Sequence, residues 1–188
     1  MISAVVLAAG ASTRFGATKQ LEVVRGKTLV QHAVDAAAPV VDEVVVVLGH
    51  DADAVESSLT LPANARIVRN PRFAEGQSSS LAAGIEACDP RSAAAVVLLG
   101  DQPGVREDHI RALVVAFEGA AAAVWRLRFL DGPGPALLPR TVWPELEALT
   151  GDVGARGILD AHPELVRWLD VAEPQPPDVD TPDDLGRA

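Results

Sequence analysis

The sequence ISAVVLAAGASTRFGATK fills residues 2–19 and joins an apolar run to a loop of small residues that carries two cations. Residues 3–7 lack the alternation of polar and apolar side chains that marks a half-exposed strand, so they predict a strand covered on both faces. Three later runs have the same character and predict further buried strands: residues 43–48, 66–69 and 94–99. Alanine-rich stretches between these runs predict helices: residues 28–38, 52–59, 79–87 and 107–117.

Such alternation of strands and helices is typical of a Rossmann-like, doubly wound α/β fold, with a mostly parallel sheet, helices on both faces and right-handed crossovers. The second half is less regular. Its patterns predict strands at 121–127, 136–138 and 165–171, a Gly/Pro-rich turn at 131–135, and helices at 143–149 and 155–162, with a short helix after the prolines of 174–177. No long linker or internal repeat is present, so we expect one domain over residues 1–188.

Composition narrows the classes of function. With 48% hydrophobic and 22% charged residues, the chain has the composition of an ordered globular protein. Its formal charge is -10 and its 16 basic residues are scattered, which argues against nucleic-acid binding but not against a small anionic ligand. The single cysteine, Cys88, requires no oxidising compartment. The apolar runs are too short to cross a membrane and the amino terminus is a poor signal peptide, so we expect a cytoplasmic protein.

The loop after the first strand has the features of an anion-binding site. Ligands of open α/β sheets bind outside the carboxyl ends of the strands, where this loop lies. Its small residues let the backbone approach a ligand, successive N–H groups form an anion-binding concavity, and Arg14 and Lys19 add positive charge. The spacing of Gly10 and Gly16 fits neither the dinucleotide motif G-x-G-x-x-G nor the P-loop. The combination suits a polyphosphate, although a plain surface turn with two solvated cations is the alternative.

A second candidate lies in residues 76–80, which read GQSSS. One serine would suffice to cap the helix that follows, whereas three serines after a glycine suggest a helix amino terminus that also contacts a ligand. Both interpretations are open from the residues alone.

Two carboxylates are candidates for a metal site. Asp101 follows the strand at 94–99, and it is either a Mg²⁺ ligand in the predicted crevice or an ordinary turn-forming residue. The segment DVDTPDD at 178–184 has a structural explanation in Thr181, Pro182 and the acids after them, which would begin a helix. Asp180 has no part in that helix start and is a candidate for a second metal ligand.

At 150–156 the sequence TGDVGAR places Asp152 and Arg156 at a junction between a loop and a helix. A capped helix with Arg156 on its solvated face accounts for this pattern, and so does a binding site for a second substrate.

The pattern L-A-A-G-x-S-x-R-x-G-x-x-K at 7–19 resembles the signature of the nucleotidyltransferase superfamily that includes molybdenum cofactor cytidylyltransferases and MobA-like NTP transferases. The resemblance implies a fold of the nucleotide-diphospho-sugar transferase type. It also implies that the loop backbone holds base and triphosphate while its Arg and Lys contact the phosphates. The residues to which these roles transfer are Leu7, Ala8, Ala9, Gly10, Arg14 and Lys19.

Other motifs extend the resemblance. The GQSSS stretch is similar to a family loop that faces the base and the acceptor, which implies nucleotide-binding roles for Gly76, Ser78, Ser79 and Ser80. The turn G-D-Q-P and the segment D-x-D-T-P-x-D are similar to the family's metal-binding segments, which implies Mg²⁺ held by Asp101 and Asp180. Arg14, Lys19 and Asp101 would then be the catalytic residues.

The resemblance also suggests the substrates. T-G-D-x-G-A-R is similar to the molybdenum-specific branch and implies that Asp152 and Arg156 bind the acceptor, and Ala9 favours CTP over GTP. The chain departs from that branch at Gly134-Pro135, where relatives carry a histidine between glycine and proline. We expect transfer of CMP from CTP to molybdopterin with release of pyrophosphate, and a molybdoenzyme as possible recipient. The alternatives are another small phosphorylated acceptor, such as a sugar phosphate or a phospholactate-like molecule, or a non-catalytic nucleotide-binding protein that delivers cofactor.

Overall fold

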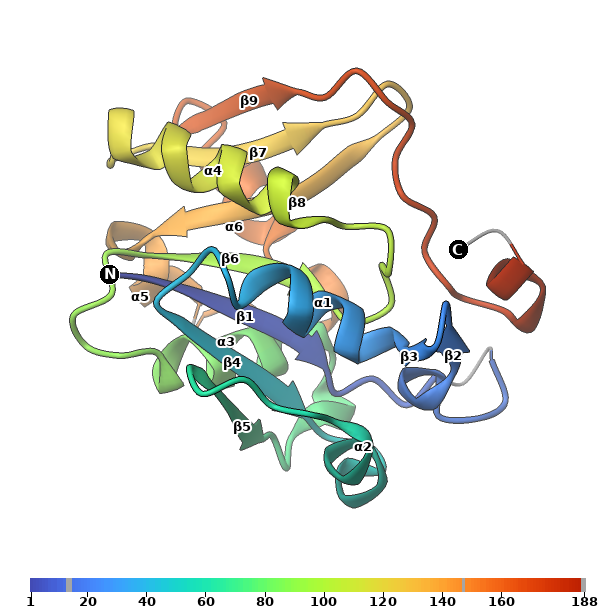
Figure 1. Ribbon diagram of the computed structural model, residues 1–188. Helices are drawn as coiled ribbons and strands as arrows, with labels where there is room; N and C mark the ends of the chain where they lie inside the picture. Colours follow the sequence, from blue (N-terminus) through green and yellow to red (C-terminus); the bar gives the residue numbers. More distant parts are fainter. Residues whose placement is uncertain (13–14, 147, 187–188) are drawn as a thin grey trace.

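The computed structural model describes residues 1–12, 15–146 and 148–186 (Figure 1). A seven-stranded sheet in the order β5-β4-β1-β6-β8-β7-β9 forms its centre. The strands are β1 (Ile2–Ala8), β4 (Glu43–Leu48), β5 (Ala65–Arg69), β6 (Ala94–Leu99), β7 (Val124–Arg128), β8 (Pro133–Pro139) and β9 (Val166–Asp170). All neighbouring pairs are parallel except the two that involve β8, so β8 alone runs against the other six. The predicted mostly parallel α/β sheet is confirmed.

Helices cover both faces of this sheet, as the sequence predicted. They are α1 (Leu29–Ala37), α2 (Ala52–Ser58), α3 (Gln77–Ala87), α4 (Glu107–Gly119), α5 (Trp143–Leu146) and α6 (Arg156–Ala161). Figure 1 shows α1 and α4 in front of the sheet and α3, α5 and α6 behind it. Among the described residues, no helix combines the length and the apolar character needed to cross a bilayer.

The core is divided into two halves by the alternation of side chains along the central strands. In β1, Ala4 and Val6 pack with α1 and α4, whereas Val5 and Leu7 pack with α3, α5 and α6 on the other face. These side chains are almost completely buried. The central strands are mostly apolar because both faces of a parallel sheet are covered, and the buried Ser3 hydroxyl of β1 is paired with Glu43 and Ser92.

The structure differs from the sequence-based prediction mainly at the edges of the sheet. β5 was predicted to be buried on both faces, but it is an edge strand with partly exposed residues. The predicted turn at 131–135 is shorter, because β8 already begins at Pro133. A small hairpin of β2 (Val23–Val24) and β3 (Lys27–Thr28) was not predicted, and α5 ends earlier than expected. The terminal helix is a 3₁₀ turn at Pro182–Gly186.

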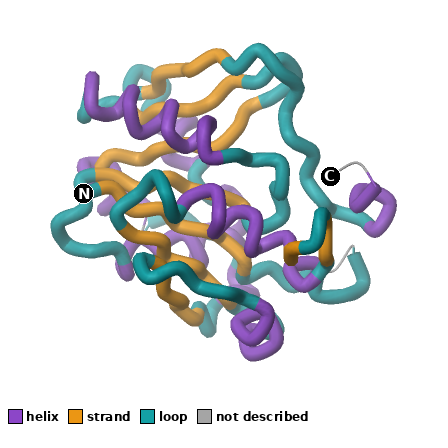
Figure 2. Tube along the Cα trace, viewed as in Figure 1, coloured by secondary structure: helices purple, strands orange, loops and turns teal. Residues whose placement is uncertain are grey.

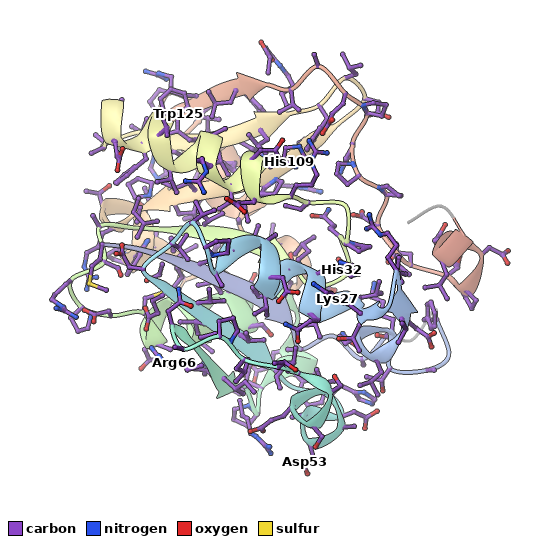
Figure 3. The ribbon with its side chains drawn as sticks, viewed as in Figure 1. Lys27, His32, Asp53, Arg66, His109 and Trp125 are labelled. Atoms are coloured by element: carbon purple, nitrogen blue, oxygen red, sulfur yellow. The ribbon has the colours of Figure 1, made fainter. Side chains whose placement is uncertain are left out.

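After β9 the chain returns along the carboxyl ends of the strands toward the β2–β3 hairpin (Figures 1 and 2). We call residues 171–186 the carboxy-terminal strap. Glu173 anchors the beginning of the strap, since its carboxylate accepts a hydrogen bond from His109 (2.7 Å) in the first turn of α4 and contacts Arg106 (2.9 Å), the residue before this helix. Figure 3 labels His109. These contacts lower the pKa of Glu173, Arg106 having the larger effect. The strap therefore reaches the edge of the sheet where ligands of this fold bind.

Gly84 lets α3 lie directly on the sheet. A Cβ atom at this position would overlap Val5 and lie 2.9 Å from Val47. We expect Gly84→Ala to lower the free energy of unfolding by roughly 1–2 kcal/mol, after the higher helix propensity of alanine is counted. Denaturant unfolding measures the change. Gly119→Ala is the matched control, because its Cβ would meet no atom within 4 Å, and equal effects of the two variants would contradict this packing.

Candidate active site

A cleft of about 580 Å³ opens at the carboxyl ends of β1 and β6. Five separate segments line it: the loop after β1, residues 73–80 at the start of α3, the turn after β6, the 150–156 loop through Asp152, and the strap. Its polar and charged lining residues are Ser12, Lys19, Gln20, Glu75, Gln77, Ser80, Asp101, Asp152 and Asp180. All the motifs singled out in the sequence thus contribute to one place or to its rim.

The loop after β1 forms one wall of the cleft. Leu7, Ala9 and Gly10 line it, whereas the side chain of Ala8 packs into the core on the opposite face. The buried amide of Gln20 braces the loop, because its Nε2 donates to the Gly10 carbonyl at 3.0 Å. The expected phosphate ligand Arg14 lies outside the described residues.

Lys19 is the centre of charge in the cleft. Its Nζ lies 2.6 Å from Asp101 Oδ2 and 3.0 Å from Asp180 Oδ1. Burial alone would lower the pKa of Lys19, but the charge and hydrogen bond of Asp101, followed by those of Asp180, outweigh it and raise the pKa above its ordinary value. The ammonium group is therefore protonated at all physiological pH values and neutralises part of the carboxylate charge.

The two carboxylates suit a hard divalent cation. Asp101 Oδ1 is buried and has no hydrogen-bond partner among the described residues, so one oxygen of this carboxylate remains for a ligand. Within the described part of the chain, no group of three or more His, Cys, Asp or Glu side chains is arranged to hold a metal. Two carboxylates fit Mg²⁺ better than a complete protein cage would, since Mg²⁺ keeps water and substrate phosphate oxygens in its other positions.

The strap brings Asp180 to this site by a specific contact. Val179 is fully buried beside Phe15 and Leu29, and its N–H donates to the Asp101 carbonyl at 3.0 Å. Asp184 then accepts hydrogen bonds from the N–H groups of Asp180 and Thr181 and so holds the turn. The Thr-Pro-Asp-Asp sequence thus has the structural role that was expected, and it also fixes the residue beside it.

The serines differ in position. They lie in the first turn of α3, which begins at Gln77 rather than at Ser79. Only Ser80 lines the cleft, and its Oγ accepts a hydrogen bond (3.0 Å) from the buried Asn70. Ser79 binds the Arg72 and Gly76 carbonyls, and Ser78 accepts from the N–H of Gly154. Two of the three predicted nucleotide ligands therefore connect loops within the protein.

Gly76 joins the start of α3 to the 150–156 loop. Its φ of +108° favours glycine, and a Cβ would overlap the backbone of Gly151. Next to it, the N–H of Gln77 donates to Asp152 Oδ1 at 3.1 Å. The expected acceptor-binding loop is thus packed against the expected nucleotide-binding loop.

A second cavity of about 220 Å³ adjoins the first, and the two share Leu7, Gln77, Leu99 and Asp152 as lining residues. Arg156 lines the second cavity but not the first. On its opposite side, Gln102 Nε2 donates to Asp178 at 2.6 Å. Burial raises the pKa of Asp178, and the nearby carboxylates add to this effect.

Several residues of this region had no signal in the sequence. Gln20, Phe15 and Phe73 line the main cleft and Arg126 lines the second cavity, yet none belongs to a motif that the residue pattern alone could single out. Gln20 directly follows Lys19, so its place beside the loop after β1 could have been noticed.

A small-residue loop, a cation and two carboxylates at the carboxyl-terminal edge of a mostly parallel sheet are typical of proteins that bind phosphorylated nucleotides with a divalent metal. The particular family follows from comparison. Residues 4–166 match the MobA-like NTP transferase domain, and the chain belongs to this family of nucleotidyltransferases.

Solved structures support the assignment. Rv0371c from Mycobacterium tuberculosis H37Rv is 34% identical with a TM-score of 0.86, over 99% of this chain and 95% of that one, and a complex of Rv0371c with manganese is also known. The nucleotidyl transferase Mth528 from Methanothermobacter thermautotroptrophicus is 26% identical with a TM-score of 0.84, over 100% and 95%.

Among curated proteins, the bifunctional protein GlmU from Solibacter usitatus is 35% identical over 138 residues, which are 70% of this chain and 29% of GlmU. The chain spans about a third of the length of the curated relatives that it matches.

The contacts of Lys19 predict a competition between this side chain and a metal ion. Lys19→Met removes the ammonium group from Asp101 and Asp180, so we expect the affinity for Mn²⁺ without nucleotide to rise about tenfold, the size of effect that a nearby opposite charge has on the proton affinity of a carboxylate. Isothermal titration calorimetry measures it. Lys27→Met is the control, because Lys27 (labelled in Figure 3) pairs with Asp35 instead. An unchanged affinity in Lys19→Met would show that the metal does not bind these carboxylates.

Proposed function

We propose that the chain transfers a nucleoside monophosphate, CMP from CTP, to a small phosphorylated acceptor, with molybdopterin as the first choice, and releases pyrophosphate. The observation that carries this proposal is the contact of Lys19 with Asp101 and Asp180 in a cleft walled by the small residues of the loop after β1. This arrangement offers positive charge and metal-binding oxygens to a triphosphate in one place.

The reaction requires no nucleophile from the protein. An oxygen of the acceptor phosphate attacks the α-phosphorus of CTP, a new P–O bond forms, and the bond between the α-phosphorus and the bridging oxygen breaks. The electron pair of that bond leaves with pyrophosphate. The protein holds the two substrates in line and neutralises the charge that grows on the leaving group.

Each part of the cleft has a role in this scheme. The backbone of residues 7–10 approaches the nucleotide closely, and Lys19, together with Arg14, binds the β- and γ-phosphates. Asp101 and Asp180 would hold the divalent ion, which would supply positive charge against the phosphates of donor and acceptor. The manganese complex of Rv0371c supports a divalent metal for this chain, and we propose Mg²⁺ as its ion.

Two further features of the chain support the choice of substrates. Ala9 in the L-A-A-G stretch supports CTP, and the TGDVGAR loop beside the cleft supports a molybdopterin acceptor. The loop packs against Gly76 and lines both cavities, which is the position that an acceptor-binding element needs.

The carboxylates give the sharpest test of the chemistry. We expect Asp101→Asn to lower the rate of pyrophosphate release by roughly a hundredfold or more while the protein stays folded. Asp183→Asn is the control, since Asp183 is an exposed acid of the strap that lines neither cavity. Circular dichroism checks the fold of each variant. A near-normal rate of Asp101→Asn in the presence of Mg²⁺ would remove this residue from the mechanism.

Substrate choice requires a screen of pyrophosphate release in which all four nucleoside triphosphates are combined with molybdopterin, sugar phosphates and phospholactate. We expect the highest kcat/KM with CTP and molybdopterin. A clear preference for GTP would contradict the role of Ala9, and turnover of a different acceptor would replace molybdopterin. Tight nucleotide binding without release from any acceptor would favour a delivery protein over an enzyme.

A further inference from the structure

Two arginines line the second cavity, and the proposed reaction does not yet assign them a ligand. Arg126 comes from β7 and Arg156 from the first position of α6, and both line the cavity. Between them and the main cleft lie Leu7, Leu99 and Asp152, which line both spaces. A group that the arginines hold in this small cavity would therefore lie next to the main cleft.

The two guanidinium groups have few partners. Arg156 forms no hydrogen bond or ion pair with any residue that the structure describes. Arg126 makes a single long hydrogen bond, from Nε to the Gly134 carbonyl at 3.3 Å, and lies 5.6 Å from the centre of the Trp168 ring. Most of the N–H donors on both side chains are thus available.

Their charges also act on each other. Burial lowers the pKa of Arg126, the positive charge of Arg156 lowers it further, and Asp160 opposes both effects. Two cations that face one small space repel each other unless an anion lies between them. The other ionisable groups in the lining, Asp152 and Asp178, contact Gln77 and Gln102 rather than the arginines.

We propose that Arg126 and Arg156 form an oxyanion subsite that binds a phosphate group of the acceptor. This inference rests on the proposed function, since it assigns the second cavity to the acceptor of that reaction. Guanidinium groups match phosphate because their N–H donors form paired hydrogen bonds with its oxygens. The Gly134-Pro135 turn lies in the same lining and offers no polar side chain, so the arginines are the positively charged groups of this cavity.

The test is a titration of the ¹⁵N-labelled protein with inorganic phosphate, followed by the Nε–H signals of the arginines. It is carried out with saturating CTP and Mg²⁺ and again without nucleotide, so that phosphate binding at the two arginines is measured even if the nucleotide binds elsewhere. We expect saturable shifts of the Arg126 and Arg156 signals under both conditions. Arg126→Gln and Arg156→Gln should each weaken phosphate binding about tenfold.

Arg128→Gln is the matched control. Arg128 lies on the same strand and near the same ring, at 5.7 Å from Trp168, but pairs with Asp170 and does not line the cavity. We expect this variant to bind phosphate like the unmodified chain.

Three results would overturn the inference: no saturable shift at either arginine, equal weakening by Arg128→Gln, or tighter binding of acetate than of phosphate. Failure of the proposed function is a separate observation, because CTP would then leave the backbone signals of Gly10 and Gly76 unchanged.

Discussion

The ammonium group of Lys19 holds together three segments that are far apart in the sequence. Two carboxylates that share a half-buried space repel each other, and they stay close only while a cation lies between them. Lys19 supplies this cation from the loop after β1, Asp101 from the end of β6, and Asp180 from the strap. Together with the buried Val179 and its hydrogen bond to the Asp101 carbonyl, that contact holds the strap against the cleft.

The sheet makes the contact possible by its connectivity. β1 and β6 are neighbours, so the loops after them open at the same edge, and the strap crosses this edge because β9 is parallel to β7. The reversed strand β8 has a second consequence. Because β8 is reversed, its first residues, 133–136, lie beside β6 and β7 at that edge and form a wall of the second cavity. The adjoining cavity thus depends on the reversed direction of β8, whereas the main cleft lies at the ends of the parallel strands β1 and β6.

Much of this arrangement could be predicted from the sequence, and the limits have physical causes. The strands at 43–48 and 94–99 were located to the residue, because apolar runs between turn residues have few other solutions. The predicted strand at 136–138 was shorter than the observed one at 133–139. Gly and Pro usually mark turns, and only the pairing with β6 and β7 shows that the strand continues through them. The motifs singled out Asp101 and Lys19, and both residues line the cleft. Arg126 was not, because a charged residue in a strand has no pattern until the topology places it beside Arg156.

Asp180 follows every strand of the sheet in the sequence, and this order matters while the chain is being made. A ribosome releases the amino-terminal part first, so the α/β core can form before the strap has been synthesised. Until then the loop after β1 and the turn after β6 lack their third member. A chain that ended at β9 would therefore have the sheet of the finished protein but would lack one of the two carboxylates of the cleft, so the site is complete only when the strap is in place.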